Sequence, residues 1–239
     1  EGKAFKTKTD ALTIKVSQLT ILSKSIKPIP DVKEKDGEKY NLVSDKELRY
    51  RKRFLDLIIN PETKENFIKR FKIINSIRSF LNNHGYIEVE TPVLQPIYGG
   101  ANAKPFTTHH NALDKKLYLR VAPELYLKRL LVGGYEKVFE INRNFRNEGI
   151  STIHNPEFTM LEFYEAYGDL QTTAKFIQKL IQDSILAVND SLKITYDQKN
   201  INFEKDFEIR SLKELVKEEL NVESLENEED IFDLAKKKK

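Results

Sequence analysis

The stretch 139–167, FEINRNFRNEGISTIHNPEFTMLEFYEAY, predicts two β-strands joined by a polar loop. In its first strand the apolar residues Phe139, Ile141 and Phe145 stand at odd-numbered positions. The even-numbered positions are polar: Glu140, Asn142, Asn144, Arg146 and Glu148. Because successive side chains of a strand point to opposite faces, we expect one face to enter a core and the other to carry polar groups.

The second strand of this hairpin alternates in the same way. Leu161 and Phe163 share one parity, and the other parity holds Phe158, Glu162 and Tyr164. We therefore expect arginine, glutamate, tyrosine and phenylalanine side chains to gather on one face of the hairpin. The plain alternative is an ordinary solvated face, since the outer face of an antiparallel sheet is usually polar.

The composition bounds the class of protein. A chain of 239 residues that is 39% hydrophobic can form one large domain or two small ones. It has no apolar run long enough to span a membrane, and it has no cysteine for disulfides or thiolate metal sites, which favours a cytoplasmic location. Because it begins with Glu1 rather than Met and ends in 236–239, KKKK, we expect a piece of a longer protein.

Positive charge is concentrated near the N-terminus. Residues 1–60 hold 14 basic and 9 acidic residues, a net charge of +5, whereas the whole chain carries +3. This part could contact a polyanion such as a nucleic acid, or it could be a solvated lysine-rich surface. The sequence leaves both interpretations open.

The N-terminal third predicts short elements separated by a linker. Residues 4–22 predict two strands, which cannot form a stable domain alone and must pair with other chain segments. A helix over 48–58 carries the basic residues Arg49, Arg51, Lys52 and Arg53. This cluster could meet an RNA backbone, a partner subunit or only solvent.

The rest of the chain alternates helices and strands. Apolar spacing predicts helices over 63–84, from Pro123 onward, over 170–188 and over 212–220. Alternation predicts strands over 86–90, over 116–121 and, as a pair, within 193–207. The turn at Gly99-Gly100 lets backbone approach a ligand closely, although such a pair is often only a turn.

Two groups of side chains can carry chemistry. Arg146 offers a planar set of donors for phosphate or carboxylate, His154 a further donor, Phe158 a stacking surface and Glu148 an acceptor. Together they indicate a nucleotide site without any Walker or Rossmann glycine pattern. Glu124 and Glu162, with Tyr164 nearby, could serve as general acid and base, as metal ligands or as a cage for an ammonium ion.

Three longer strings carry a resemblance to a known family. They are 122–129 APELYLKR, 145–148 FRNE and 154–159 HNPEFT. With the helix and strand before Pro92, they resemble the class II lysyl-tRNA synthetases of the bacterial and eukaryotic type. The resemblance covers nearly the whole chain and is weakest from Leu192 onward.

The resemblance implies an α+β fold with an antiparallel six-stranded sheet flanked by helices. It divides the chain into 1–30, the tail of an OB-fold anticodon-binding domain, 31–60, a linker and connecting helix, and 61–239, a catalytic domain. That domain would hold the first two class II motifs and be truncated within the insertion before the third. The helix and strand over 62–95 would form a homodimer.

The family's site residues map onto positions of this chain. The resemblance assigns ATP binding to Arg146, Glu148, His154 and Phe158, and lysine binding to Gly100, Glu124, Arg146, Glu162 and Tyr164. Arg146 is the expected catalytic residue, which stabilises charge in the transition state. The implied reaction activates L-lysine with ATP to lysyl-adenylate and transfers it to the 3′ end of tRNA(Lys).

The chain departs from the family by lacking the third motif. We expect no metal ligand within it, the ligands for Mg²⁺ lying beyond residue 239, and poor activity of these residues alone. Three alternatives remain: a paralogue that modifies a protein, a non-catalytic RNA-binding or regulatory fragment, and an aspartyl- or asparaginyl-type synthetase. The carboxylate pair argues against the third alternative, because neither of those substrates has a cationic side chain.

Overall fold

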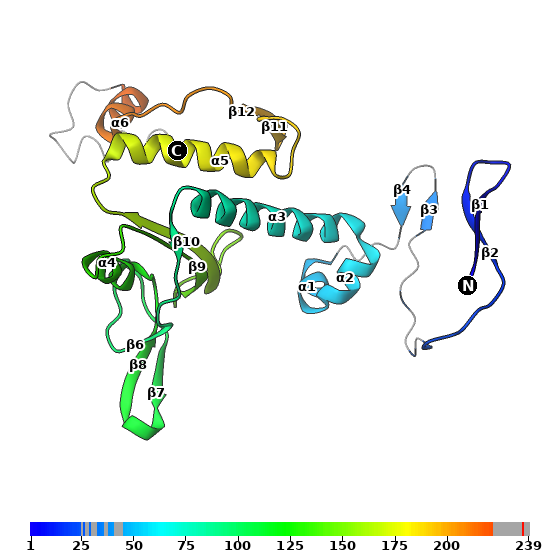
Figure 1. Cartoon of the computed structure of the whole chain (residues 1–239), viewed down its shortest axis with the longest axis horizontal. Helices are drawn as coiled ribbons and strands as arrows, with labels where there is room; N and C mark the ends of the chain where they lie inside the picture. Colours follow the sequence, from blue (N-terminus) through cyan, green and yellow to red (C-terminus); the bar gives the residue numbers. More distant parts are fainter. Residues whose placement is uncertain are drawn as a thin grey trace. The chain divides into compact units, whose positions relative to one another are not determined.

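The computed structural model describes residues 1–24, 26, 29, 33–35, 38–40, 45–221 and 236 (Figure 1). The chain divides into two compact units, Glu1–Ile68 and Lys69–Lys239. Much of the predicted linker, residues 31, 32, 36, 37 and 41–44, falls outside the described residues.

The first unit begins with an antiparallel hairpin of β1 (Gly2–Lys6) and β2 (Leu12–Val16). This confirms the strand pair predicted over 4–22. A short antiparallel ladder follows, formed by β3 (Lys33–Lys35) and β4 (Glu38–Tyr40). The apolar side chains of Leu12, Ile14 and Val16 are exposed, as expected for strands that lack a packing partner.

The helix predicted over 48–58 is wrong as a single element. The chain forms α1 (Lys46–Arg51) and α2 (Arg53–Ile59), and between them Lys52 has φ −121° and ψ 56°, outside the helical region. No glycine or proline marks this break in the sequence.

A buried carboxylate holds the two short helices together. The Asp56 side chain is 0% exposed and accepts hydrogen bonds from Arg49 Nε at 2.8 Å and from Arg53 Nη1. Asn60 Nδ2 donates to the same carboxylate at 2.6 Å. Burial raises the pKa of Asp56, but the hydrogen bonds from Asn60 and Arg49 outweigh it and hold that pKa below its ordinary value.

The second unit is built around the predicted hairpin. The strands β9 (Lys137–Phe145) and β10 (Glu157–Glu165) pair antiparallel, with Phe145 opposite Glu157. A short strand, β5 (Ile87–Glu88), pairs parallel with β9 and completes a sheet of order β10-β9-β5. Three helices contact this sheet: α3 (Pro61–Asn83), which begins in the first unit, α4 (Glu124–Val132) and α5 (Leu170–Leu186).

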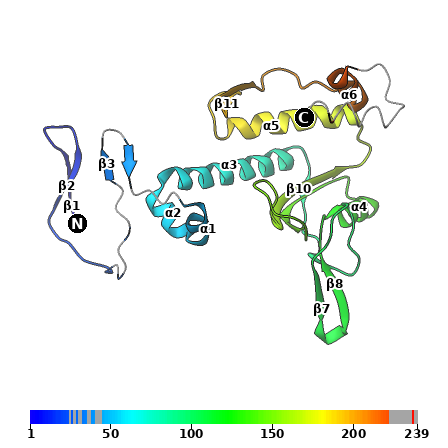
Figure 2. The ribbon, with the colours of Figure 1, turned by 180° about the vertical axis from the view of Figure 1, so that it is seen from behind.

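A second three-stranded sheet has the order β6-β8-β7, formed by β6 (Leu94–Gln95), β8 (Lys115–Leu119) and β7 (Thr107–His110). The 3₁₀ turn η1 (Asn111–Leu113) closes the β7–β8 hairpin, which projects from the rest of this unit (Figure 2). The expected single antiparallel sheet is therefore wrong for the described residues. They hold two separate three-stranded sheets besides three two-stranded ones, and the β5–β9 pair is parallel.

The last described elements match their prediction. The strands β11 (Lys193–Tyr196) and β12 (Lys199–Asn202) form a hairpin, and Asp197 and Gln198 turn it with φ of 47° and 62°. Positive φ at both central residues suits the right-handed twist of a two-residue hairpin. The helix α6 (Leu212–Leu220) begins at the capping box of Ser211 and Glu214.

The core lies between the helices and one face of the hairpin. Figures 1 and 2 show α3 and α5 side by side over β9 and β10, with α4 across the opposite face. Fully or nearly buried residues from these elements form one cluster: Phe80, Leu81, Tyr86, Phe139 and Leu180. Around them the aromatic rings of Phe163 and Phe176 stand 5.6 Å apart. The apolar parity of the hairpin therefore enters the core, as predicted.

Within the described residues, no helix is both long enough and apolar enough to cross a bilayer.

The core generates a stability prediction. Leu81 is 0% exposed, so Leu81→Ala leaves a cavity and should lower the free energy of unfolding by about 2–5 kcal/mol. Lys72→Ala on the exposed face of the same helix is the control and should change it by less than about 0.5 kcal/mol. Urea denaturation followed by circular dichroism measures both, and equal effects would contradict the assigned core.

Candidate active site

The register of β9 and β10 sets one face of the hairpin as the site. Glu162 lies opposite Glu140, and Phe158 lies opposite Asn144. Directly opposite residues of an antiparallel pair point to the same face, so the predicted gathering of polar and aromatic side chains is confirmed. The centre of this face is not solvated, however, because Glu140 and Asn144 are each only 1% exposed.

A cavity of about 600 Å³ lies beyond the ends of these strands. It is lined by the loop that follows β9 and by residues near the start of β10. The eight lining residues are Arg146, Glu148, Gly149, Ile153, His154, Asn155, Phe158 and Thr159. All four residues that the resemblance assigns to ATP are among them, and the sequence assigned no role to the other four.

The loop 146–156 is held at several points by backbone hydrogen bonds. Arg146 N–H donates to Pro156 O at 2.9 Å, and Asn147 N–H donates to Lys104 O at 2.8 Å. Lys104 N–H in turn donates to Glu148 Oε1 at 3.3 Å. Ser151 Oγ and His154 Nδ1 form a hydrogen bond of 2.8 Å. The residues 104 and 148, far apart in sequence, are therefore joined at the mouth of the cavity.

Arg146 has an unused donor. Its guanidinium carbon lies 5.1 Å from the centroid of the Phe158 ring, a cation–π geometry. Its Nε is buried and has no hydrogen-bond partner among the described residues. Since a buried donor without an acceptor is costly, the cavity favours an anionic ligand at this position.

A second group of predicted residues meets beside α4. Tyr164 O–H donates to Glu162 Oε2 at 2.8 Å, and Lys128 Nζ pairs with Glu124 Oε1 at 2.6 Å. The Lys128 ammonium also lies 5.9 Å from the centroid of the Tyr164 ring. The Lys128 ammonium group therefore contacts both the Glu124 carboxylate and the face of the Tyr164 ring.

Gly100 lies against the start of α4, beside Glu124, and must be a glycine. It has φ +86°, and a Cβ at this position would stand 2.8 Å from Glu124 Cβ and 3.2 Å from Ala122 Cβ. Any side chain would therefore both strain the backbone and clash with the start of α4.

The surroundings perturb two titrating groups. Burial raises the pKa of Glu162, the hydrogen bond from Tyr164 opposes that rise, and the charges of Glu124 and Glu140 add to it. Burial and the hydrogen bond to Glu162 raise the pKa of Tyr164, which therefore stays protonated as a donor. A cationic ligand would favour the ionised form of Glu162.

The structure adds a buried ion pair that the sequence did not single out as functional. Arg120 and Glu140 have side chains that are 0% and 1% exposed, and Arg120 Nη1 lies 2.6 Å from Glu140 Oε1. Glu140 has the same parity as the predicted site residues, which is the signal that could have found it. No comparable pattern in the sequence points to Arg120, because only the fold brings it next to Glu140.

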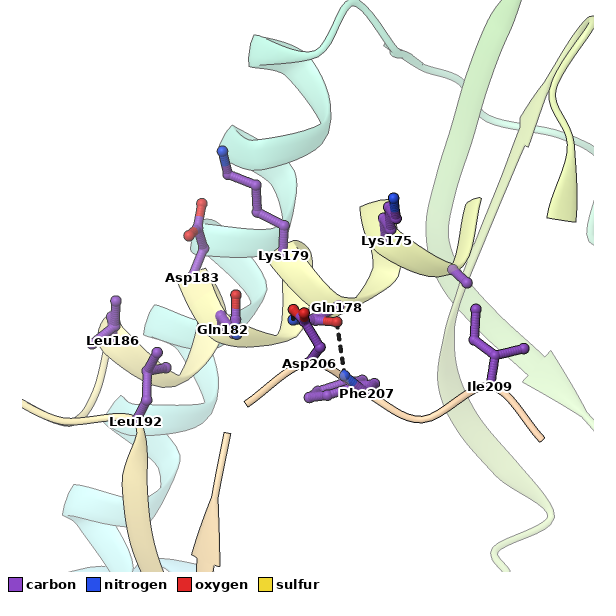
Figure 3. A pocket seen from close by; sticks show the side chains of 11 residues that line it. Lys175, Gln178, Lys179, Gln182, Asp183, Leu186, Leu192, Asp206, Phe207 and Ile209 are labelled. Atoms are coloured by element: carbon purple, nitrogen blue, oxygen red, sulfur yellow. Dashed lines mark hydrogen bonds between the residues drawn. The ribbon is translucent and has the colours of Figure 1, made fainter. Parts of the chain in front are cut away.

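A different cavity, of about 680 Å³, lies against α5 and shares no residue with the predicted site (Figure 3). Its charged lining residues are Lys175, Lys179, Asp183 and Asp206, two of each sign. The segment after β12 is tied to α5 there, where Phe207 N–H donates to Gln178 Oε1 at 3.0 Å. With balanced charge, this cavity shows no preference for a polyanion.

Among the residues that the structure describes, no group of three or more His, Cys, Asp or Glu side chains is placed to hold a metal ion. The prediction that Mg²⁺ ligands lie beyond residue 239 stays a prediction.

The raised pKa of Glu162 predicts a pH-dependent effect on stability. Because the pKa of Glu162 is raised in the folded state, its ionisation destabilises the fold at pH values above the ordinary carboxyl pKa. Glu162→Gln removes this effect and should raise the melting temperature at pH 7 by about 1–4 °C. At pH 4 the native carboxyl is protonated and the gain should vanish. The exposed Glu136→Gln is the control. A loss of stability of the same size at both pH values would contradict the prediction.

Comparison with known proteins places the chain in a family. Residues 45–237 match the family model described as tRNA synthetases class II (D, K and N). A protein named lysine–tRNA ligase from Syntrophomonas wolfei is 55% identical over 203 residues, which is 85% of this chain and 40% of that protein. Another of that name, from Chromobacterium violaceum, is 51% identical over 217 residues, 91% of this chain and 42% of that protein.

A third relative of the same name, from Carboxydothermus hydrogenoformans, is 55% identical over 204 residues. The chain spans about two fifths of the length of these relatives. The match of the family model covers most of the chain, including both groups of site residues. The chain therefore belongs to the class II tRNA synthetases (D, K and N).

Proposed function

We propose that this chain supplies the ATP- and lysine-binding part of a lysine–tRNA ligase. The observation that carries the proposal is one strand face with two adjoining sites. The anion-binding cavity at Arg146 and the acidic pocket at Glu162 lie on the same face of β9 and β10, roughly 13 Å apart along the strands. The name shared by the relatives supports this assignment.

In the cavity, we assign a role to each of four residues. Phe158 stacks on the adenine ring, and Glu148 accepts from the exocyclic amine. Arg146 and His154 contact the phosphates, and the unpartnered Nε of Arg146 supports an oxygen acceptor there. A nucleotide offers a planar base to Phe158, an amine to Glu148 and phosphates to Arg146. A simple anion would use only the last of these residues, so the site favours a nucleotide.

In the acidic pocket, Glu124 and Glu162 bind the two ammonium groups of lysine. Tyr164 orients Glu162 through its hydrogen bond, and Gly100 allows the loop backbone to contact the amino acid. The pairing of Lys128 with Glu124 supports this, because an ammonium group of the chain itself contacts one of these carboxylates. A neutral or acidic side chain of the substrate would leave the half-buried Glu162 carboxylate uncompensated, which is unfavourable.

The proposed chemistry needs no basic side chain. A carboxylate oxygen of lysine attacks the α-phosphorus of ATP, and pyrophosphate leaves with the bonding electrons. Arg146 stabilises the negative charge that develops on the α-phosphate oxygens, and positioning supplies the rest of the rate. Mg²⁺, which we propose is held by residues beyond Lys239, would neutralise charge on the phosphates.

The proposed protein then transfers the lysyl group to tRNA(Lys). The exposed apolar side chains of β1 and β2 support the interpretation of residues 1–30 as part of a larger OB-fold domain. The basic charge of residues 1–60 supports an RNA partner for this region. A cytoplasmic location is part of the same proposal.

We also propose a homodimer through residues 62–95. Phe71 is 60% exposed on α3 although it is aromatic, and Ile68 and Ile87 are exposed as well. Exposed apolar side chains on α3 and β5 support a surface that a partner covers.

An exchange assay tests the proposed reaction in the protein at the full length of its relatives. Lysine should support ATP–pyrophosphate exchange, whereas aspartate and asparagine should not. Arg146→Ala should lower the lysine-dependent rate by about 10²–10³-fold, since it removes charge stabilisation in the transition state. Arg143→Ala, at an exposed ion pair of the same strand, is the control. Exchange with aspartate in place of lysine would overturn the pocket assignment.

Sedimentation tests the proposed dimer. Phe71→Asp places a charge in the centre of the proposed interface and should shift the protein to a monomer at micromolar concentration. Lys72→Asp, one residue away, controls for a general effect of negative charge. An unchanged dimer in the Phe71 variant would place the interface elsewhere.

A further inference from the structure

We propose that the buried pair Arg120–Glu140 is a positioning pair for the lysine pocket. It holds Glu162 and Glu124 in place and sets the charge of the pocket to match a substrate with one surplus positive charge. This inference rests on the proposed function and adds two residues to it.

The strand register places Glu140 beside Glu162. The two residues are direct partners in the β9–β10 ladder, so their side chains share one face with neighbouring Cβ atoms about 5 Å apart. Like charges in this arrangement repel each other. Arg120 relieves the repulsion, because its Nη1 donates to Glu140 Oε1 at 2.6 Å in a fully buried setting.

Arg120 also joins three segments of the chain. Its Nε donates to Arg143 O at 3.0 Å, and its Nη1 donates to Thr91 Oγ1 at 3.0 Å. Thr91 Oγ1 donates in turn to Glu140 Oε2 at 2.6 Å. One guanidinium thus fixes the end of β9 against the segment that follows β5.

The backbone of Arg120 extends this connection to both sites. Its N–H donates to Val93 O at 2.9 Å, and its carbonyl accepts from Phe145 N–H at 3.0 Å. Phe145 directly precedes Arg146, and Arg120 stands four residues before Glu124. A shift of Arg120 would therefore move the catalytic arginine and the acidic pocket together.

The charge of the cluster fits lysine. Three carboxylates, Glu124, Glu140 and Glu162, face two cations, Arg120 and Lys128, which leaves one negative charge. Free lysine carries one net positive charge at pH 7, whereas aspartate carries one negative charge and asparagine none. The cluster is complementary to lysine alone among these three substrates.

The electrostatic effect on Glu162 has a definite sign for each partner. Burial is the largest cause of its raised pKa; the charge of Glu140 raises the pKa further, and the charge of Arg120 lowers it. The other groups that face Glu162 are Tyr164 on β10 and Glu124 on α4, and Lys128 lies over Tyr164. Removing Arg120 or Glu140 should therefore move the protonation of Glu162 in opposite directions.

The test measures the KM for lysine between pH 5 and pH 8, by ATP–pyrophosphate exchange in the protein at the full length of its relatives. Glu140→Gln should extend lysine binding to lower pH, so that KM rises about three- to tenfold less between pH 8 and pH 5 than it does in the unsubstituted protein. Arg120→Met should have the opposite effect, and Arg120→Lys should restore part of it. A purely structural role would raise KM in both variants alike and leave the pH profile unchanged.

Arg120→Met leaves Glu140 buried without its counter-ion and can prevent folding, so the double variant Arg120→Met/Glu140→Gln is included. It removes both charges and should keep the pH profile of KM near that of the unsubstituted protein while lowering kcat at least about tenfold, because the positioning contacts are lost. Arg143→Met and Glu157→Gln, from an exposed ion pair of the same two strands, are the controls.

The possible results distinguish a failure of the proposed function from a failure of the proposed role of Arg120 and Glu140. If lysine supports no exchange in the unsubstituted protein, the proposed function fails. If lysine-dependent exchange is present but the acidic end of the KM profile does not move in Glu140→Gln, only the role of the buried pair is overturned.

Discussion

The direct pairing of Glu140 with Glu162 is the constraint on which the rest of the site depends. Two carboxylates side by side on a sheet are unfavourable unless a cation compensates them. Arg120 compensates Glu140 from within the fold, and we propose that a cationic ligand compensates Glu162. Tyr164 donates a hydrogen bond to Glu162 and thereby orients the carboxylate that Arg120 does not compensate.

The opposite face of the hairpin makes this arrangement rigid. Phe139, Phe163 and the residues of α3 and α5 that pack on them form an apolar cluster, and its burial supplies most of the free energy that fixes the strands. A slip of the register by one residue would expose that cluster and bury the charged groups. Hydrophobic packing on one face thus determines the electrostatics on the other.

The sequence predicts the strands and helices whose apolar residues recur at a regular spacing. Alternation around Phe139 and Phe163 was enough to predict the hairpin and its two faces, and helical spacing was enough for α3 and α5. It could not predict the break at Lys52, which no glycine or proline marks, or the role of Arg120. Arg120 directly follows β8, whose alternation is ordinary, and its contacts are with residues that are distant in sequence. The resemblance assigned the site residues, and the structure brings them together in two adjoining places.

We propose above all that the same face of β9 and β10 carries both the nucleotide site and the lysine site. A crystal structure of the chain with a sulfamoyl analogue of lysyl-adenylate tests it most directly. The account predicts the adenine on the Phe158 ring, the phosphate mimic at Arg146 and the ammonium groups at Glu124 and Glu162. An analogue bound in the cavity against α5, or with its lysyl group directed away from Glu162, would contradict it.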